Sequence, residues 1–313
     1  MQSQQGALSV RKLMNQSEKK RRLYKKLEKL VPIALFLIAS VSIMTTAAII
    51  YVLLSESIAF FKEVSIIEFF TGTVLKPMSK TPSFGILPLL VGTLTSTVIA
   101  LSVAVPIGLL AAIYLSEYAS SKVRAWLKPI LEVLAGIPTI VYGFFAFTFV
   151  TPILQYVIPN LAPTNILSPG IVMGIMIIPM ITSLAEDAMH AVPQTMRDGA
   201  FGLGSSRIEV ALKIVFPAAL SGIIAAVVLA LSRAIGETMI VTIASGSSKN
   251  LTFDITQSMQ TMTAYIVEVT GGDAPAGSTI YYSLYAVGMT LFVFTFIMNI
   301  CANLIAKKLR QKY

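Results

Sequence analysis

Long apolar runs separated by short polar segments dominate the hydropathy pattern of this 313-residue chain. A helix that crosses a bilayer needs about 20 mostly apolar residues. We predict six membrane spans, over residues 31–54, 86–115, 129–158, 170–184, 218–245 and 281–306. Because only helices and closed barrels satisfy their own backbone hydrogen bonds in lipid, the pattern predicts an all-α integral membrane protein.

Prolines lie inside several of these apolar runs, among them Pro106, Pro138 and Pro179. A proline removes one backbone hydrogen bond from a helix. In a bilayer the freed carbonyl must be satisfied by a neighbouring helix or by water. Interrupted spans of this kind are more typical of transporters than of simple membrane anchors.

Charge at the two ends of the chain predicts its orientation. The segment 1–30 and the tail 307–313 carry far more Lys and Arg than Asp and Glu, and such an excess marks the cytoplasmic side of a membrane. Both termini are therefore predicted to be cytoplasmic. The segment 1–30 fits a basic helix at the lipid surface, with an arm for an anionic partner as the alternative.

The remaining boundaries follow from this orientation. Residues 31–54 form the first predicted transmembrane helix. Residues 55–85 form an extracytoplasmic loop, since they have no positive excess. Residues 86–306 form a predicted core of five helices, which includes an inner loop at 185–217. Unlike the termini, that inner loop is nearly balanced in charge.

Composition agrees with a membrane protein and removes several other classes. Only 12% of the residues are charged, against roughly 25% in soluble domains. The net charge of +9 sits beside the apolar runs, so it needs no nucleic acid to explain it. One cysteine, Cys301, cannot form an intrachain disulfide, and one histidine, His190, excludes a His-rich metal site. The sequence shows no nucleophile–base or metal-ligand group of an enzyme, and we expect no cofactor on this chain.

The predicted inner loop carries a spaced motif. After Arg197 the chain reads D-G-A, three residues, Gly204, nine residues and then I-V-F-P, which ends at Pro217. Asp198 could cap a short helix, Gly204 allows the left-handed turn that ends it, and Pro217 suits the start of the next helix. The spacing predicts a short helix, a sharp turn and a long helix.

This motif resembles the signature loop of binding-protein-dependent ABC importer permeases, written E-A-A, three residues, G, nine residues, I-x-L-P. The spacing matches throughout, with Asp198, Gly199 and Phe216 as the departures. The resemblance implies a type I ABC importer permease fold and a separate ATPase subunit that docks on the short helix and uses ATP and Mg. This chain has no G-x-x-x-x-G-K-[ST] motif of its own. The expected coupling residues are Arg197, Asp198, Gly199, Ala200, Gly204, Arg207, Ile214 and Pro217, and the two arginines and Asp198 would supply polar contacts.

Two charges lie inside the fifth predicted span. Arg233 and Glu237 are four residues apart, hence on one face of a helix, and a charge at membrane depth is costly unless it has a role. A guanidinium suits a tetrahedral oxyanion because its planar fork gives parallel donors and keeps its charge. A structural ion pair within or between helices is the alternative. The expected substrate-translocation residues are Arg233, Glu237, Thr238 and Ser232.

The sequence around these charges resembles phosphate-specific ABC permeases. The segment S-R-A-I-G-E-T-M carries the resemblance, and L-A-G-I-P-T-I-V-Y-G is similar to the PstC-type subunit rather than its PstA-type counterpart. The resemblance implies a phosphate import complex in a bacterial inner membrane, in which this chain forms half of the pathway and has no catalytic role. The implied partners are a PstA-type second permease, a homodimeric PstB-type ATPase, an extracytoplasmic PstS-type phosphate-binding protein and membrane lipid, without nucleic acid.

Two other transporter functions stay open at this point. One arginine does not separate phosphate from molybdate or sulfate. An ion-coupled secondary transporter could use Glu237 and Glu132 as coupling acids, but it would leave the spacing of the inner loop unexplained. Glu132 itself is expected at the cytoplasmic interface or in a central cavity.

Overall fold

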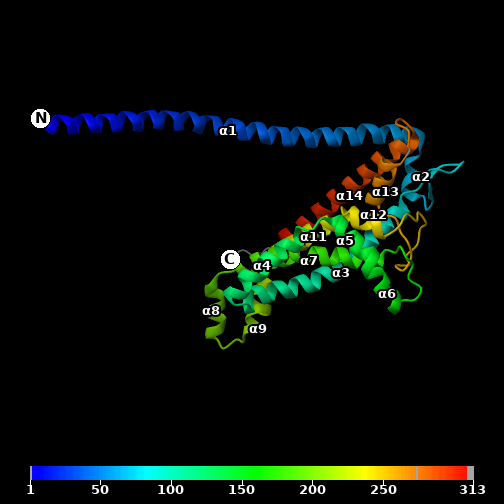
Figure 1. Cartoon of the computed structure of the whole chain (residues 1–313). Helices are drawn as coiled ribbons and strands as arrows, with labels where there is room; N and C mark the ends of the chain where they lie inside the picture. Colours follow the sequence, from blue (N-terminus) through cyan, green and yellow to red (C-terminus); the bar gives the residue numbers. More distant parts are fainter. Residues whose placement is uncertain (1, 273, 309–313) are drawn as a thin grey trace. The chain divides into compact units, whose positions relative to one another are not determined.

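The computed structural model describes residues 2–272 and 274–308, and almost all of the regular structure in them is helical (Figure 1). The chain divides into two compact units, residues 1–55 and residues 56–313. Five helices are long and apolar enough to cross a membrane, and a sixth span results if one sharply bent helix pair is counted. The prediction of an all-helical membrane protein is therefore confirmed, with five or six candidate spans.

The first unit lies within helix α1 (Gln2–Glu63). The part of α1 over Leu30–Glu63 has a mean hydropathy of 2.4 and the length of a span, so it contains the predicted first span. The helix does not end there at residue 54. Its last turns, from Glu56 to Glu63, belong to the second unit, where Phe60 is fully buried.

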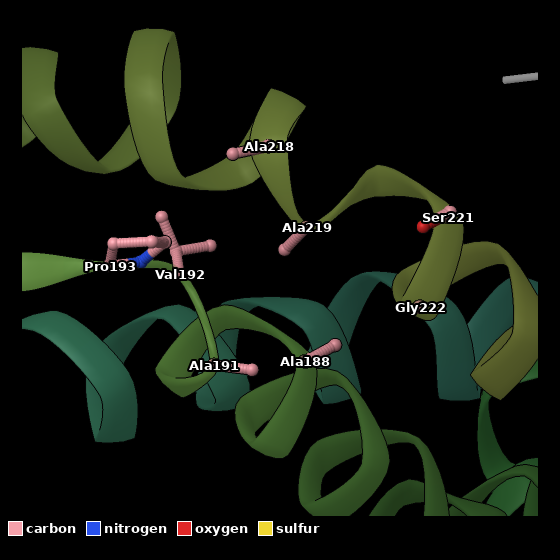
Figure 2. A pocket seen from close by; sticks show the side chains of 8 residues that line it. All are labelled: Ala188, Ala191, Val192, Pro193, Ala218, Ala219, Ser221 and Gly222. Atoms are coloured by element: carbon pink, nitrogen blue, oxygen red, sulfur yellow. The ribbon is translucent and has the colours of Figure 1, made fainter. Parts of the chain in front are cut away.

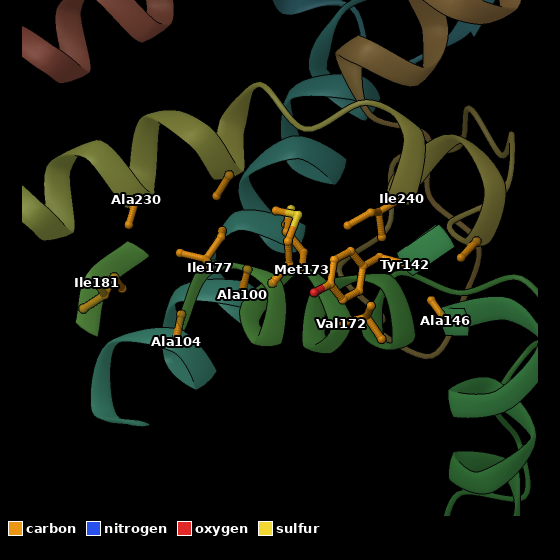
Figure 3. Close-up of a cluster of buried hydrophobic side chains, with 13 residues drawn as sticks. Ala100, Ala104, Tyr142, Ala146, Val172, Met173, Ile177, Ile181, Ala230 and Ile240 are labelled. Atoms are coloured by element: carbon orange, nitrogen blue, oxygen red, sulfur yellow. The ribbon is translucent and has the colours of Figure 1, made fainter. Parts of the chain in front are cut away.

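The core of the second unit is built where α3 (Leu87–Ile113) packs along α7 (Leu167–His190). Small side chains line this contact, including Ala100 and Ala104 of α3 (Figure 3). A Cβ atom at Gly174 of α7 would lie only 2.7 Å from the carbonyl oxygen of Ala100. Small residues let membrane helices approach closely and gain van der Waals contact, which explains why the two helices pack so tightly here.

Further segments contribute to this core. Tyr142 comes from α5 (Thr139–Phe145), Ala230 from α11 (Leu220–Ile235) and Ile240 from α12 (Met239–Ala244) (Figure 3). The last long helix, α14, packs on α11 and α13. The remaining elements of this region are η1 (Tyr114–Tyr118), η2 (Ala146–Val150), α6 (Thr151–Val157), α13 (Met262–Gly271) and α14 (Thr279–Lys308).

The elements on the predicted outer side are small. Helix α2 (Ile66–Thr71) is followed by a hairpin of β1 (Leu75–Lys76) and β2 (Ser83–Phe84), in which Leu75 pairs with Phe84. Helix α2 and the hairpin both lie within residues 55–85, where the sequence predicts only a loop. Aromatic edge-to-face contacts of Phe60 with Phe69 and Phe84 hold them on the second core cluster.

The third predicted span, residues 129–158, begins too early. Helix α4 (Ser121–Ala135) ends before Pro138, and the span-length helical stretch is Thr139–Val157. The residue before a proline avoids helical backbone angles, so the chain breaks between the two helices. Glu132 therefore lies exposed on α4, outside the apolar span.

The fifth predicted span, residues 218–245, is the largest correction. Helical structure begins before Pro217, at Arg207, because Ser206 and Glu209 form a capping box. It then continues through α9 (Arg207–Glu209), η3 (Val210–Val215) and α10 (Phe216–Ala218), and bends by 71° before α11. A second break at Gly236 separates α11 from α12. Two breaks thus replace the expected single helix.

The fourth and sixth predicted spans are confirmed but are longer than expected. Helix α7 ends at His190, so it includes the first residues of the predicted inner loop, 185–217. Helix α14 covers the sixth span, and residues 309–313 of the predicted basic tail lie outside the described residues.

Candidate functional site

The inner loop contains a short exposed helix, α8 (Gln194–Gly202). The backbone of Gly204 has φ = +85°, the left-handed conformation that the sequence predicted. The amide of Ser205 donates to the carbonyl of Ala200 at 3.1 Å, which closes the turn. The chain then enters the capping box of α9 at Ser206. A short helix, a sharp turn and a second helix are therefore all present.

Asp198 does not cap this helix as we expected. The position before the first residue of α8 is Pro193, and Asp198 lies one turn inside, where its carboxylate accepts a hydrogen bond from the Gln194 side chain at 3.0 Å. Proline fixes its own φ and so ends the preceding segment without a side-chain cap. Asp198 is exposed, as are its neighbours Gly199 and Gly202.

The orientation of the Arg197 side chain differs most from the one that the sequence predicts. Arg197 lies on the same helix but points into the protein, where only 8% of the residue is exposed. Its guanidinium pairs with Glu117 of η1, at 3.0 Å between Nη2 and Oε1. It also donates to the carbonyls of Val192 and Met189. These bonds leave little of the guanidinium free for a partner protein, which the sequence alone did not reveal.

The other expected coupling residues divide into packing and exposed groups. Ala200 and Ile214 pack in the third apolar cluster, with Met189 and Val215. Pro217 is half-buried at the second position of α10, which directly continues η3, so it does not begin the helical segment. Arg207 is exposed and lines a polar cavity of about 450 Å³. The other residues that line this cavity are Ser116, Glu117, His190, Val192, Gln194, Arg197 and Phe201.

A second cavity, of about 270 Å³, lies beside the 71° bend. Figure 2 shows Ala218, Ala219 and Ser221 on one side of it and Ala188, Ala191, Val192 and Pro193 on the other. The small side chains leave space next to the bend. At Gly222 a Cβ atom would come within 2.5 Å of the Ala188 Cβ, so the two helices touch where the cavity ends.

A buried acid near the end of α7 forms an ion cluster with α4. Glu186 is 0% exposed and pairs with Arg124 and with Lys128, the latter at 2.8 Å between Nζ and Oε2. Lys128 also reaches Asp187 at 2.9 Å, and the Arg124 guanidinium contacts the His190 ring at 3.3 Å. The sequence pattern does not indicate this cluster, because it places Glu186 in the predicted inner loop.

The break in the fifth span separates the two charges that the sequence placed on one helix face. Gly236 ends α11, so Arg233 lies in the last turn of α11 and Glu237 lies beyond it. Glu237 is buried, and its carboxylate accepts the amides of Met239 and Ile240, at 3.2 and 3.4 Å. It thus accepts the first two amides of α12, whose N-cap is Thr238, and the expectation that Arg233 and Glu237 lie on one face of a single helix is wrong.

Arg233 is exposed on the surface of this single chain, and none of the described ion pairs or hydrogen bonds involves its side chain. The hydroxyl of Ser232 instead contacts Asn299 of α14 at 2.6 Å, and that of Thr238 donates to the Gly236 carbonyl at 3.2 Å. Of the four expected translocation residues, Ser232, Glu237 and Thr238 therefore have hydrogen-bond partners. Within the described part of the chain, only the guanidinium of Arg233 among the four has none.

Helix α13 holds this break in place from the outer side. The hydroxyl of Thr263 donates to the Glu237 carbonyl at 2.7 Å, and the amide of Met262 donates to Thr93 of α3 at 3.0 Å. Thr263 is a further residue that the sequence analysis missed, since its partner is 26 positions away. Within the described residues, no group of three His, Cys, Asp or Glu could hold a metal ion.

The sequence matches a known transporter family over most of this region. The family described as "Binding-protein-dependent transport system inner membrane component" matches residues 104–311, which include α8, the 71° bend and the break at Gly236. The chain belongs to this family. It is the permease subunit of an ABC importer, a multi-pass protein of the inner membrane.

Curated relatives of the permease agree. It is 33% identical to the "Probable ABC transporter permease protein YqgH" of Bacillus subtilis, over 75% of each chain. It is 32% identical to the "Phosphate transport system permease protein PstC" of Mesorhizobium japonicum, over 74% of this chain and 75% of that one. It is 33% identical to the "Phosphate transport system permease protein PstC 1" of Mycobacterium tuberculosis, over 70% and 71%.

Solved structures share the fold of the permease. A chain of a bacterial ABC transporter for the import of alginate matches with a TM-score of 0.64 and 15% identity, over 93% of this chain and 100% of that one. A chain of the MetNI methionine ABC transporter in an inward-facing conformation matches with a TM-score of 0.54 and 14% identity, over 72% and 95%.

Membership decides several of the open alternatives. The permease is not an enzyme and carries no cofactor, because ATP is handled by a separate ATPase subunit with which it associates, together with a periplasmic binding protein. The hypothesis of an ion-coupled secondary transporter does not fit this family and is withdrawn.

Proposed function

We propose that this permease imports phosphate and forms half of the translocation pathway, beside a PstA-type second permease. A homodimeric PstB-type ATPase and a PstS-type phosphate-binding protein complete the proposed complex. The observation that carries the proposal is the exposed guanidinium of Arg233 at a break in an apolar span. Relatives named as phosphate permeases, at 31–33% identity, support the choice of ion.

The depth of Arg233 argues for a place in the pathway. It lies about 20 Å along α11 from its first residue, at the usual helical rise. A charge at that depth is costly unless it faces an aqueous cavity or a partner. Glu237, the nearest acid in the sequence, accepts α12 amides, and among the described residues it forms no ion pair with the guanidinium. An incoming dianion therefore meets a charge that never deprotonates.

The exposed face of α8 fits the role of the ATPase docking site. Asp198 and Gly199 are exposed, and Leu203, directly after the helix, is 90% exposed. The glycines at 199 and 204 have open space where a side chain would stand, so another protein can approach the backbone closely. We propose that the ATPase contacts this face and that Arg207 adds a polar contact beside it.

Uptake of radiolabelled phosphate by cells without their own high-affinity system tests the cargo. The cells would carry this permease with its partner subunits, and sulfate and molybdate would compete with the label. Uptake that resists both competitors and stops with an ATPase that cannot hydrolyse ATP supports phosphate import. Uptake of molybdate or sulfate in its place would favour the alternative cargo, since the same guanidinium suits any tetrahedral dianion.

A pair of glycine substitutions tests the docking site. We expect Gly204→Ala to weaken binding of the ATPase, because a side chain in the left-handed conformation costs about 1–2 kcal/mol and disturbs the turn that presents α8. The measurement is the amount of ATPase that co-purifies with the permease.

Gly202→Ala is the matched control. Gly202 also has open space around it, but it has no positive φ, so alanine there is tolerated and stabilises by about 0.4–1 kcal/mol at most. Equal co-purification for both variants would show that the turn at Gly204 does not position a docking surface.

A further inference from the structure

The exposed helix α8 is attached to the rest of the permease at very few points. Of its residues only Arg197 and Ala200 are buried. A Cβ atom at position 199 or 202 would have no neighbouring atom within 4 Å. A force applied to the outer face of α8 therefore reaches the protein mainly through Arg197, Ala200 and the partly buried Met196, and through the chain connections at each end of the helix.

Arg197 makes most of the specific contacts. Its side chain and that of Glu117 are each 9% exposed. Nη2 lies 3.0 Å from Oε1 of Glu117, and Nε lies 3.4 Å from Oε2, which gives the two-pronged geometry that a guanidinium and a carboxylate favour. The contact joins residues 80 positions apart, so it links α8 to a distant part of the chain.

The same guanidinium also holds the end of α7. Nη1 donates to the carbonyl of Val192 at 2.5 Å, and Nη2 donates to that of Met189 at 2.8 Å. Met189 lies in the last turn of α7, and Glu117 lies in η1, which directly continues α3. One side chain thus ties α8 to the cytoplasmic ends of the two helices that form the core of the permease.

We propose that Glu117 and Arg197 are positioning residues, which transmit a displacement of α8 to the membrane helices α3 and α7. This proposal rests on the proposed docking of the ATPase at α8. A largely buried, doubly bonded pair moves as one body with both elements, because breaking it leaves a largely buried charge without its partner. The nearby pair of Glu209 and Lys213 is exposed, and it transmits nothing, since such surface pairs contribute little.

Transport efficiency distinguishes transmission from a merely structural contact. The full complex, with its second permease, ATPase and phosphate-binding protein, would be reconstituted in liposomes. We expect Arg197→Met and Glu117→Gln each to retain the ATPase in the complex and yet to raise the ATP hydrolysed per phosphate transported by about fivefold or more, within the usual range of coupling between sites. The double variant should be no worse than either single variant.

Lys213→Met is the matched control and should leave this ratio unchanged. A wild-type ratio in both Arg197→Met and Glu117→Gln would overturn the proposal. So would loss of the ATPase from both of these complexes, because the pair would then serve only to keep the docking surface folded.

A distance measurement decides the matter without any substrate. Nitroxide labels would be placed at Gly202→Cys on α8 and Tyr118→Cys on η1, in a Cys301→Ala background. In the otherwise unchanged complex the distance between the labels should be the same with and without ATP, and Glu117→Gln should broaden it. A wild-type distance that changes with ATP would contradict a rigid link. Because this readout needs only ATP, a complex that carries no phosphate would refute the proposed cargo and leave the proposed link to be judged on its own.

Discussion

Replacing Arg233 by glutamine is expected to lower phosphate uptake by at least about 100-fold, since two hydrogen bonds from a charged donor, each worth roughly 1.5–3 kcal/mol, are lost together. The fold should be retained, because the side chain is exposed in this chain and engages none of the described acids. The measurement is the initial rate of uptake over a range of phosphate concentrations, with the amount of assembled complex determined in parallel.

Two further variants, one at Arg233 and one at the neighbouring Ser232, sharpen this prediction. Arg233→Lys keeps the charge but loses the planar fork, so its uptake should lie between that of the wild type and that of Arg233→Gln. Ser232→Ala removes a hydroxyl that is bonded to Val228 and Asn299 and should leave the concentration dependence of uptake almost unchanged. Normal uptake by Arg233→Gln would remove this arginine from the pathway and favour a contact with the second permease subunit.

Glu237 shows what sequence periodicity could and could not predict around this arginine. The apolar runs predicted the number of spans, because the length of a run follows from the thickness of the bilayer alone. Periodicity also placed Arg233 and Glu237 on one face, on the assumption of an unbroken helix. The break at Gly236 depends on tertiary contacts, such as the Thr263 hydroxyl on the Glu237 carbonyl, and a single glycine in an apolar run does not reveal those contacts.

The inner loop shows the same division. The left-handed turn at Gly204 was predictable because it depends on the local conformational freedom of glycine. The orientation of Arg197 was not, because its partner Glu117 lies 80 residues earlier in the chain. Glu117 is the only acidic residue in the segment 116–128, which also holds Lys122, Arg124 and Lys128. This isolation among basic residues was the one sequence signal that pointed to it.

The buried acid of α7, Glu186, leads to a prediction about stability: the cost depends on which partner of the ion cluster is removed. Arg124 and Lys128 have side chains that are 25% and 32% exposed, whereas Glu186 is 0% exposed. Each cation can therefore reach water if its partner is lost, but the carboxylate cannot. We expect the double variant Arg124→Met/Lys128→Met to lower the free energy of unfolding by about 3–5 kcal/mol, because it leaves an unpaired buried charge.

Removing the acid instead should cost far less. We expect Glu186→Leu to be close to neutral, since a well-packed apolar side chain often replaces a buried ion pair without loss. Adding Glu186→Leu to the double variant should restore most of the lost stability, which is the reverse of additive behaviour. Thermal unfolding of the four proteins in one detergent measures this cycle. If the triple variant were as unstable as the double variant, the loss of stability would come from the methionine substitutions and not from an unpaired Glu186. The cations of α4 would then stabilise the end of α7 by packing of their aliphatic stems.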